Sequence, residues 1–265
     1  NAHRMPLGQV AQVLDDSLGK QWKEAFKRFD FKPVAAASIG QVHRATLRDG
    51  REVAIKLQYP GIERSIDSDI RNVGMLLKLS GMLPDGIDLD PLLDEARHQL
   101  HHEADYEHEA ELLRRFHAHL EQDQRFTLPG VIGELSSRRV LTMDYLHGKS
   151  IETIENLESA KRNDAARHLT ELAFREVFDW GLVQTDPNFA NYLYEHETGR
   201  IQLLDFGAAR EHDKQQRIDM RMLLNACAAN NDELILDAAA RVGYLGNDDP
   251  PGYARSVLLL LRTAT

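Results

Sequence analysis

The chain has 265 residues, of which 42% are hydrophobic and 28% are charged, and its formal net charge is −10. This is the composition of a globular protein large enough for two lobes, and its single cysteine, Cys227, excludes an intramolecular disulfide and a cysteine-rich zinc site. The acidic balance argues against a general nucleic-acid-binding protein, although it leaves a local basic patch open.

The first half of the chain predicts one helix followed by a β-rich region. Apolar residues at helical spacing indicate an amphipathic helix over residues 6–19. Strands are expected over 31–38, 40–47 and 52–58, with Asp49-Gly50 as a hairpin turn between the last two. Residues 62–79 predict a helix, 81–91 a connector, and 92 to about 122 a long charged helix.

The second half is expected to be mainly helical. A buried strand over 140–146 precedes Gly148, and short strands are expected around Tyr192 and Leu203. Helices are predicted over 150–180, 214–229, 231–241 and 253–262. The fold class is therefore α+β, with a β-rich N-lobe over 1–146 and a helical C-lobe over 147–265. Every apolar run is shorter than the roughly 18 to 20 residues that would span a bilayer.

The third predicted strand carries a lysine among apolar residues. Val53-Ala54-Ile55 precede Lys56 in a pattern that indicates burial. A buried lysine is costly unless its ammonium reaches an anion, so Lys56 is a candidate for binding nucleotide phosphates. A lysine on the solvent face of the strand stays open as the alternative.

Two further segments place oxygen-bearing side chains beside short strands. Asp205 ends a strand just before Phe206-Gly207, and a carboxylate there suits Mg²⁺, which prefers oxygen ligands. Asp186 and Asn191 lie in one polar loop, where a carboxylate would orient a nucleophile and an amide oxygen would bind a metal ion. Each segment taken alone is also compatible with a polar turn.

The order of these residues is more specific than any one of them. Lys56, Asp186, Asn191 and Asp205 occur in the order that protein-kinase chemistry requires, and Asp186 and Asn191 have the spacing of a kinase catalytic loop. We therefore expect Lys56 and Asp186 to be catalytic, and Asn191 and Asp205 to be metal ligands. The backbone from Met143 to Leu146 is expected to face the adenine of a nucleotide.

A kinase-like lysine needs a carboxylate partner from a helix. The acidic helix reads HQLHHEADYEHEAE over residues 98–111, and it does not form the zinc motif H-E-x-x-H, because position 106 is a tyrosine. Most of its charged residues are expected on a solvated face. Glu103 and Asp105 are the candidates to reach the nucleotide site, and helical register alone does not separate Glu103 from Glu107.

Five segments in combination carry a family resemblance. They read PVAAASIGQVHRA, VAIKLQYPGI, HEADYEHEA, QTDPNFANYLY and LLDFGAARE. Together they resemble the UbiB, or aarF-domain, atypical kinase-like family, and within it the coenzyme Q-biosynthesis members of mitochondrial type. The resemblance runs from about Leu7 to Arg210.

The resemblance implies a protein-kinase-like fold that binds Mg²⁺ with ATP or ADP. It implies support of ubiquinone biosynthesis through ATPase activity, rather than protein phosphorylation in trans. Matched position by position, the family's functional residues are the alanine-rich nucleotide loop Ala35, Ala36, Ala37 and Ser38, the phosphate-binding Lys56, its helix partner Glu103 within the E-x-D motif completed by Asp105, the catalytic-loop Asp186, and the metal ligands Asn191 and Asp205.

The resemblance also sets expectations for partners and compartment. Expected partners are ATP, isoprenoid-quinone precursors, quinone-biosynthesis proteins and a membrane surface, but not nucleic acid. The implied location is the mitochondrial matrix at the inner membrane, or the bacterial cytoplasm, and not the secreted space. The family's K-x-G-Q motif has a look-alike without lysine at residues 6–9, so we expect the motif upstream of Asn1 and the helical lobe to continue beyond Thr265.

Two other functions stay open. One is a nucleotide-binding scaffold of the quinone-synthesising complex with negligible turnover, and the other is a small-molecule or protein kinase. A pure scaffold need not keep Lys56, Asp186, Asn191 and Asp205 together, so the complete set favours turnover. Gln184-Thr185 stand where typical protein kinases carry His-Arg, which argues against an ordinary protein kinase.

The alanine-rich segment replaces the glycines that usually cover a nucleotide. Glycine lets backbone amides crowd round phosphates, whereas alanine keeps a loop small but restricts its backbone. A stiffer loop over Ala35–Ala37 would hold the nucleotide in a different pose and disfavour transfer to a bulky protein acceptor. The alternative is that these alanines serve tight strand packing.

Overall fold

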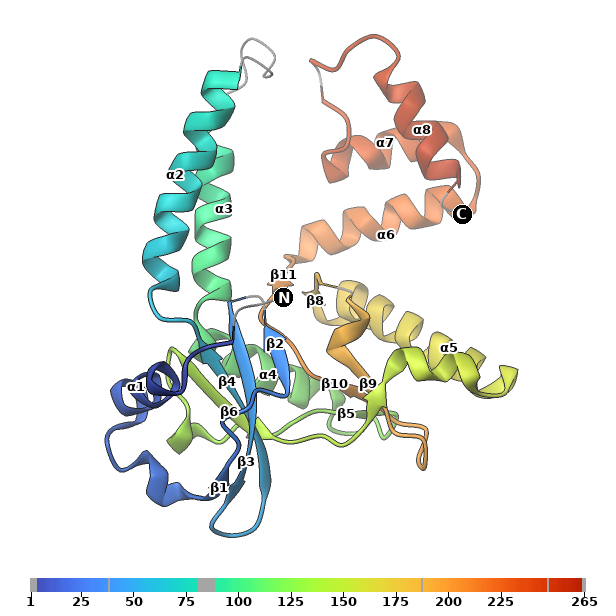
Figure 1. Cartoon of the computed structure of the whole chain (residues 1–265). Coiled ribbons are helices and arrows are strands. Elements are labelled where there is room, and N and C mark those ends of the chain that lie inside the picture. Colours follow the sequence, from blue (N-terminus) through green and yellow to red (C-terminus); the bar gives the residue numbers. More distant parts are fainter. Residues whose placement is uncertain (1–3, 38, 81–88, 187, 247, 264–265) are drawn as a thin grey trace. The chain divides into compact units, whose positions relative to one another are not determined.

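The structure is a computed structural model that describes residues 4–37, 39–80, 89–186, 188–246 and 248–263 (Figure 1). The chain divides into two compact units, Asn1–Lys161 with Pro187–Ala208, and Arg162–Asp186 with Ala209–Thr265. The lobe boundary expected after residue 146 stays a prediction. Within the described ranges, every helix is too short or too polar to cross a membrane.

A five-stranded antiparallel sheet is the centre of the first unit (Figure 1). Strands β1 and β2 pair with opposite ends of β3, and β3, β4 and β6 follow one another across the sheet. Strand β4 is therefore internal, with neighbours on both edges. The strands are β1 (Phe26–Phe29), β2 (Ala35–Ala37), β3 (Gly40–Leu47), β4 (Glu52–Gln58) and β6 (Val140–Asp144).

The predicted hairpin between β3 and β4 is confirmed. Gly50 has a φ of +93°, and the Arg51 N–H donates to the Asp49 carboxylate at 2.9 Å, which closes the turn. The strand predicted over 31–38 is too long, because among the described residues of that range only Ala35–Ala37 is β structure. Pro33 has no N–H to donate to a neighbouring strand. Strand β1, which the pattern missed, pairs with the far end of β3.

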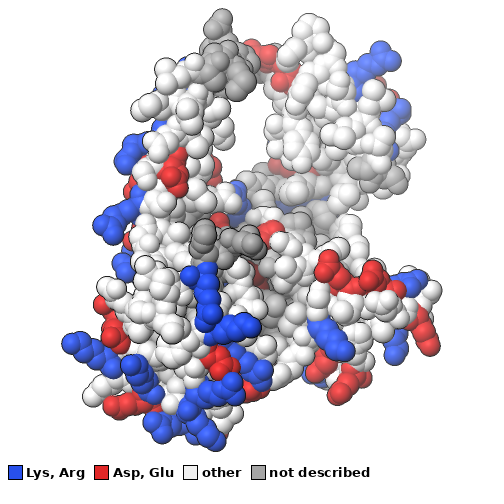
Figure 2. Space-filling model, in the orientation of Figure 1, with Lys and Arg blue, Asp and Glu red and all other residues white. Residues whose placement is uncertain are grey.

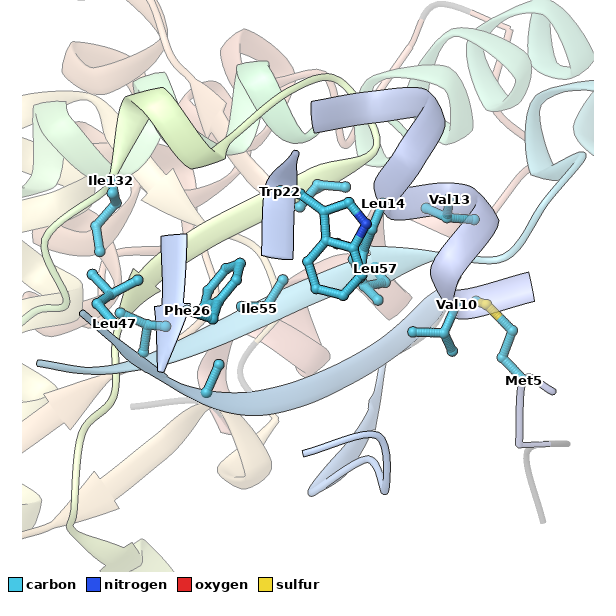
Figure 3. Packing of buried hydrophobic residues seen from close by; sticks show 13 residues of the cluster. Met5, Val10, Val13, Leu14, Trp22, Phe26, Leu47, Ile55, Leu57 and Ile132 are labelled. Atoms are coloured by element: carbon cyan, nitrogen blue, oxygen red, sulfur yellow. The ribbon is translucent and has the colours of Figure 1, made fainter. Parts of the chain in front are cut away.

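Helix α1 (Leu7–Leu18) packs its apolar face on this sheet, as its periodicity predicts (Figure 3). Trp22 lies in the same layer, and its indole N–H donates to Asp15 of α1 at 2.7 Å. Its ring also makes edge contacts with Phe26 and Phe29 of β1. This cluster holds β1 in place at the edge of the sheet, which explains why a strand forms there although its own sequence pattern is weak. The buried members are Met5, Val10, Val13, Leu14, Trp22, Phe26, Ala45, Leu47, Val53, Ile55, Leu57, Ile132 and Val140.

The long helix expected over 92–122 is wrong, because the chain breaks into α3 (Asp90–Glu103) and α4 (Tyr106–Leu120). Asp105 at the break has extended backbone, and its carboxylate accepts the N–H groups of Glu107 and His108 as an N-cap. The side chain of Gln58 in β4 donates to the carbonyl of Ala104, so a hydrogen bond to the sheet stabilises the break between the two helices. Helix α2 (Ile62–Ser80) is confirmed and packs on α3, while most of the connector predicted over 81–91 lies outside the described residues.

A second, smaller sheet completes the first unit. Its strands pair in the order β5-β10-β9-β7, with β9 and β10 forming the hairpin expected around Tyr192 and Leu203. The very short β5 and β7 gave no sequence signal. The strands are β5 (Phe126–Thr127), β7 (Lys149–Ser150), β9 (Tyr192–Tyr194) and β10 (Ile201–Leu203).

The second unit is mainly helical. The helix expected over 150–180 begins in the first unit and is interrupted: Ile151–Asn156 is 3₁₀-helical, α5 covers Ser159–Arg175, and Glu176–Trp180 forms a π-helical turn. The unit also contains a two-stranded sheet of β8 (Leu182–Gln184) and β11 (Ala209–Glu211). Three predicted helices are confirmed within a residue or two, and their apolar faces share one core: α6 (Lys214–Ala228), α7 (Asp232–Val242) and α8 (Tyr253–Thr263).

Basic side chains gather over β1 and the β3–β4 turn despite the acidic net charge (Figure 2). Carboxylates are interspersed with them, because three of the cations form ion pairs there: Arg28 with Asp30, Arg44 with Glu52, and Arg51 with Asp49. Exposed pairs of this kind contribute at most about 1 kcal/mol. The local basic patch left open by the composition is therefore partly neutralised in the folded chain.

Replacing Gly40 by alanine should destabilise the first unit. A Cβ at Gly40 would lie 2.1 Å from the carbonyl oxygen of Leu57, which is backbone of the internal strand and cannot move aside. We expect Gly40→Ala to lower the free energy of unfolding by about 3 kcal/mol. Urea unfolding measures this loss.

Gly8→Ala is the matched control, because nothing lies within 4 Å of a Cβ at that helical position. It should raise the free energy of unfolding by about 0.5 kcal/mol through the better helix propensity of alanine. Equal effects of the two substitutions would contradict the close approach of β3 and β4.

Candidate nucleotide site

Lys56 lies in the middle of the first unit's sheet. It pairs with Val42 of β3 and Leu141 of β6, and its side chain is only 6% exposed. Its ammonium donates to Glu109 of α4 at 2.5 Å and to Asp205 at 2.9 Å. The solvent-facing alternative for Lys56 is therefore wrong, and the buried cation is held by two carboxylates from distant parts of the sequence.

Burial and charge act against each other on these groups. Burial lowers the pKa of the Lys56 ammonium, but Glu109 and Asp205 outweigh it and raise the pKa above its ordinary value. Burial raises the pKa of the Glu109 carboxyl to about 7, against the attraction of Lys56. Burial also raises the pKa of Asp205, but Lys56 and the Gly207 N–H lower it overall. One cation between two carboxylates leaves an excess negative charge, so the more buried acid binds a proton more readily.

Asp205 is held in place by its neighbours in the predicted strand-end turn. One carboxylate oxygen accepts the Gly207 N–H at 3.0 Å, and the other accepts Lys56. Phe206 is buried, and its ring centroid lies 4.8 Å from that of Phe116 on α4. The aromatic contact ties this turn to the helix that supplies Glu109. The position of Asp205 therefore depends on α4 as well as on its own strand.

Asn191 and Asp205 are brought to the same end of the β9–β10 hairpin. Tyr192 pairs with Leu203, and the Leu204 N–H donates to the carbonyl of Asn191 at 3.0 Å. Asn191 directly precedes β9, and Asp205 comes two residues after β10 ends, so both lie near the paired end of the hairpin. Among the described residues, no three or more His, Cys, Asp or Glu side chains form a complete metal cage. Two donors suit Mg²⁺, which commonly completes its shell with water and substrate phosphates.

The predicted pairing of Lys56 with Glu103 is wrong. Glu103 is the last residue of α3, whereas the carboxylate that contacts Lys56 is Glu109, in the second turn of α4. The helix break at Asp105 changes the direction and the register of the chain between these two acids. A continuous helix, which the sequence pattern favoured, would not have separated them in this way.

The remaining predicted nucleotide residues are located as follows. Asp105 caps α4 and lies 3.6 Å from the guanidinium of Arg138, and its role toward nucleotide stays a prediction. Met143 is buried in β6 opposite Ala54, and Leu146 is half-buried beyond the end of that strand. Contact of this segment with adenine also stays a prediction.

The alanine-rich segment forms strand β2 and pairs with the start of β3. Ala35 and Ala36 are exposed and Ala37 is half-buried, so tight packing does not explain the choice of alanine. The residue that packing does restrict is Gly40, on the partner strand. Ser38, the fourth residue matched to the nucleotide loop, lies outside the described residues.

Asp186 belongs to the second compact unit and follows strand β8. Its N–H donates to the side-chain oxygen of Gln184 at 3.1 Å, and the Gln184 N–H donates to Glu176 at 2.9 Å. Glu176 is 5% exposed. Burial raises the pKa of its carboxyl to about 7, with the Gln184 N–H opposing the shift. Sequence patterns did not single out Glu176.

The comparisons with known proteins place the whole arrangement in one family. A family model described as the ABC1 atypical kinase-like domain matches residues 1–239. The chain belongs to the ABC1 atypical kinase-like family. The predicted α+β kinase-like fold and the resemblance drawn from the sequence motifs are thereby confirmed.

The chain spans less than half the length of the two curated relatives compared with it below. It is 43% identical over 94% of its length to the protein named atypical kinase COQ8, mitochondrial, of Schizosaccharomyces pombe, and covers 41% of that protein. It is 41% identical over 97% of its length to atypical kinase coq-8, mitochondrial, of Caenorhabditis elegans, and covers 34% of it. A solved complex of Rv3197 with erythromycin from Mycobacterium tuberculosis has a TM-score of 0.76 at 30% identity, over 94% of this chain and 63% of that one.

Glu109 is the important residue of the ABC1 domain that sequence reasoning missed. A signal for it exists in the apolar spacing of α4, because Tyr106, Leu113 and Phe116 are buried on the same stripe of the helix. Among the acidic residues of this helix, Glu109 shares that stripe, and Glu107 is exposed. A carboxylate on a buried stripe indicates a cationic partner.

Removing the Glu109 carboxylate should destabilise the chain far more than removing that of Glu103. Glu109→Ala leaves the buried Lys56 ammonium with one of its two carboxylates, and we expect a loss of about 3 kcal/mol in the free energy of unfolding. Glu103→Ala at the half-exposed helix end should cost less than about 1 kcal/mol. Urea unfolding compares the two, and a larger loss for Glu103→Ala would restore the original pairing.

Glu176 should make the stability of the chain depend on pH. Its folded pKa of about 7 lies above the ordinary carboxyl value of 4.5, so the folded state holds the proton more tightly than the unfolded state. The stabilisation is complete below the unfolded pKa and is lost as the pH rises through 7. The loss from pH 5 to pH 8 should reach up to about 3 kcal/mol.

Glu176→Gln is the control, since an amide of the same shape cannot ionise. The difference between wild type and variant in the free energy of unfolding, measured at pH 5 and at pH 8, isolates this one group. A difference that does not change with pH would contradict the raised pKa.

Proposed function

We propose that this ABC1 domain binds Mg-ATP and hydrolyses it in support of ubiquinone biosynthesis. The observation that carries the proposal is the buried Lys56 ammonium between Glu109 and Asp205. Kinase-like phosphoryl transfer needs a lysine held by a helix carboxylate next to a metal-binding aspartate. The relatives named atypical kinase COQ8 support the same reading.

Each candidate site residue would have a defined role in the reaction. Lys56 would donate to the nucleotide phosphates while Glu109 keeps it charged and in place. Asp205 and Asn191 would hold Mg²⁺, which supplies positive charge to the phosphates. Asp186 would orient the attacking oxygen of water or of a small acceptor and accept its proton. The restricted backbone of Ala35–Ala37 would favour such a small acceptor over a protein chain.

The partners and the cellular location are part of the proposal. We propose isoprenoid-quinone precursors and quinone-biosynthesis proteins as partners, with peripheral membrane association. The relatives named as mitochondrial support a mitochondrial location. Within the mitochondrion we propose the matrix at the inner membrane, and for a bacterial source the bacterial cytoplasm.

Mg-ADP should stabilise the wild-type chain against heat, and Asp205→Asn should weaken this effect. The substitution removes the charge of a hard-ion ligand while keeping its shape, so the midpoint of unfolding should rise less with Mg-ADP than in wild type. Chelation of Mg²⁺ by EDTA should have a similar effect on wild type.

Asp49→Asn is the matched control for this thermal-shift comparison, because Asp49 lies in the exposed hairpin turn, where asparagine is equally suited. Equal stabilisation of wild type and Asp205→Asn by Mg-ADP would count against the metal assignment.

Asp186→Asn should lower ATP hydrolysis by about 10²-fold or more if Asp186 is a general base. Nucleotide affinity should change much less, since Mg²⁺ is assigned to Asn191 and Asp205. The assay uses the full-length protein with ATP labelled at the γ-phosphate, with and without membranes and phenolic quinone precursors, and scores free phosphate and protein-bound label separately.

The three outcomes of this assay separate the candidate functions. Release of free phosphate that Asp186→Asn lowers by about 10²-fold or more supports the ATPase. Nucleotide binding without turnover in the wild type would favour the scaffold. Labelling of a generic protein substrate without phosphate release would favour an ordinary kinase.

A further inference from the structure

Glu176 holds strand β8 at both of its ends. Its main-chain carbonyl accepts the Gly181 N–H at 2.8 Å, just before the strand begins. Its carboxylate accepts the Gln184 N–H at 2.9 Å, where the strand ends. The whole of β8 is therefore bracketed by two hydrogen bonds to one residue.

The second of these bonds continues toward Asp186. Gln184, whose N–H is held by Glu176, uses its own side-chain oxygen to accept the Asp186 N–H at 3.1 Å. Two successive hydrogen bonds thus link the Glu176 carboxylate to the backbone of Asp186. All three residues belong to the second unit, so the link does not depend on how the units are arranged.

The turn that carries Glu176 is itself fixed from α6 and the residues before it. The His212 N–H donates to the carbonyl of Gly181 at 2.7 Å, and Gly181 has a φ of +67°. A Cβ at Gly181 would lie 2.7 Å from the carbonyl oxygen of His212, which leaves no room for a larger residue. The guanidiniums of Arg217 and Arg221 donate to carbonyls within the π-helical turn at 3.0 and 3.1 Å. A π-helical turn of this kind often occurs at a functional position.

Burying a carboxylate carries a desolvation penalty that packing alone does not require. Glu176 is 5% exposed, and an apolar residue of similar size would pack there without a desolvation penalty. What the carboxylate provides is an oxygen directed at the Gln184 N–H. A carboxyl group offers the N–H an acceptor oxygen in either protonation state, and an apolar side chain offers none.

We propose that Glu176 is a positioning residue that sets the backbone of Gln184 and, through it, the place of Asp186. The proposal rests on the proposed ATPase function, in which Asp186 orients the attacking oxygen. Small displacements of such a group cost rate because the reacting atoms must lie within a narrow range of distance and angle. Nucleotide binding is assigned to Lys56, Asn191 and Asp205 of the other unit, so loss of the Glu176 carboxylate should affect turnover and spare affinity.

The experiment compares Glu176→Ala and Glu176→Gln with wild type in the full-length protein. Glu176→Ala removes the acceptor and should lower kcat for ATP hydrolysis by about tenfold or more, with the Kd for Mg-ADP within about twofold of wild type. Glu176→Gln keeps an oxygen at the same place and should retain kcat within about threefold. Glu171→Ala, at an exposed carboxylate on α5, is the matched control and should behave like wild type.

A structural readout accompanies the kinetics. Hydrogen exchange of the Gln184 amide, followed by NMR, should speed up in Glu176→Ala and stay slow in Glu176→Gln. A residue that matters for folding alone would lower kcat and binding capacity together, in proportion to the folded fraction. If Glu176→Ala does not fold, Glu176→Asp replaces it, since that change withdraws the acceptor by one methylene and should also lower kcat.

Each outcome decides the matter. Wild-type kcat in folded Glu176→Ala, or in Glu176→Asp where the alanine variant does not fold, would overturn the positioning role alone. Equal loss of kcat in Glu176→Ala and Glu176→Gln would overturn it as well, because the retained oxygen would then be irrelevant. Absence of hydrolysis in the wild type would overturn the proposed function and the positioning role together.

Discussion

A charged lysine in the interior of a β sheet is the constraint on which the first unit depends. Lys56 lies on an internal strand with a neighbouring strand on each side, so its ammonium is shielded from water. Carboxylates must therefore supply the hydrogen bonds and negative charge that the buried ammonium needs. One comes from α4 and the other from the turn after β10. Elements far apart in the sequence must therefore meet at one ammonium group, and the break between α3 and α4 gives Glu109 its place.

The same contact links structure to chemistry. A carboxylate pair around a lysine keeps the ammonium charged for an anionic ligand, and Asp205, the proposed metal ligand, is one of the pair. Phe206 and Phe116 couple the turn of Asp205 to α4, so movement of the helix would disturb both carboxylates. In the second unit Asp186 depends on a separate support, the hydrogen bonds that begin at Glu176. In the proposed function, nucleotide binding and nucleophile orientation would therefore depend on different buried acids, Glu109 and Glu176.

Motif order predicted the kinase-like fold well, because Lys56 lies within an apolar strand and Asn191 and Asp205 flank the short strands of one hairpin. Which acid of the acidic helix pairs with Lys56 was harder to predict. A helix of alternating acids offers several candidates, and the break at Asp105 depends on Gln58 and Arg138, which are distant in the sequence. The apolar stripe through Tyr106, Leu113 and Phe116 would have selected Glu109 if periodicity had been weighed above motif position. Glu176 left no pattern, since its partner is a backbone N–H.

A crystal structure with ADP and Mn²⁺ in place of Mg²⁺ tests the central claim most directly. We expect the anomalous peak of Mn²⁺ at about 2.0 to 2.3 Å from a side-chain oxygen of Asp205 and from that of Asn191, the range typical of a divalent ion bound to oxygen. We also expect Lys56 to donate to a phosphate oxygen while its contact with Glu109 persists. Manganese and nucleotide bound away from Asp205, with Lys56 remote from every phosphate, would contradict the claim.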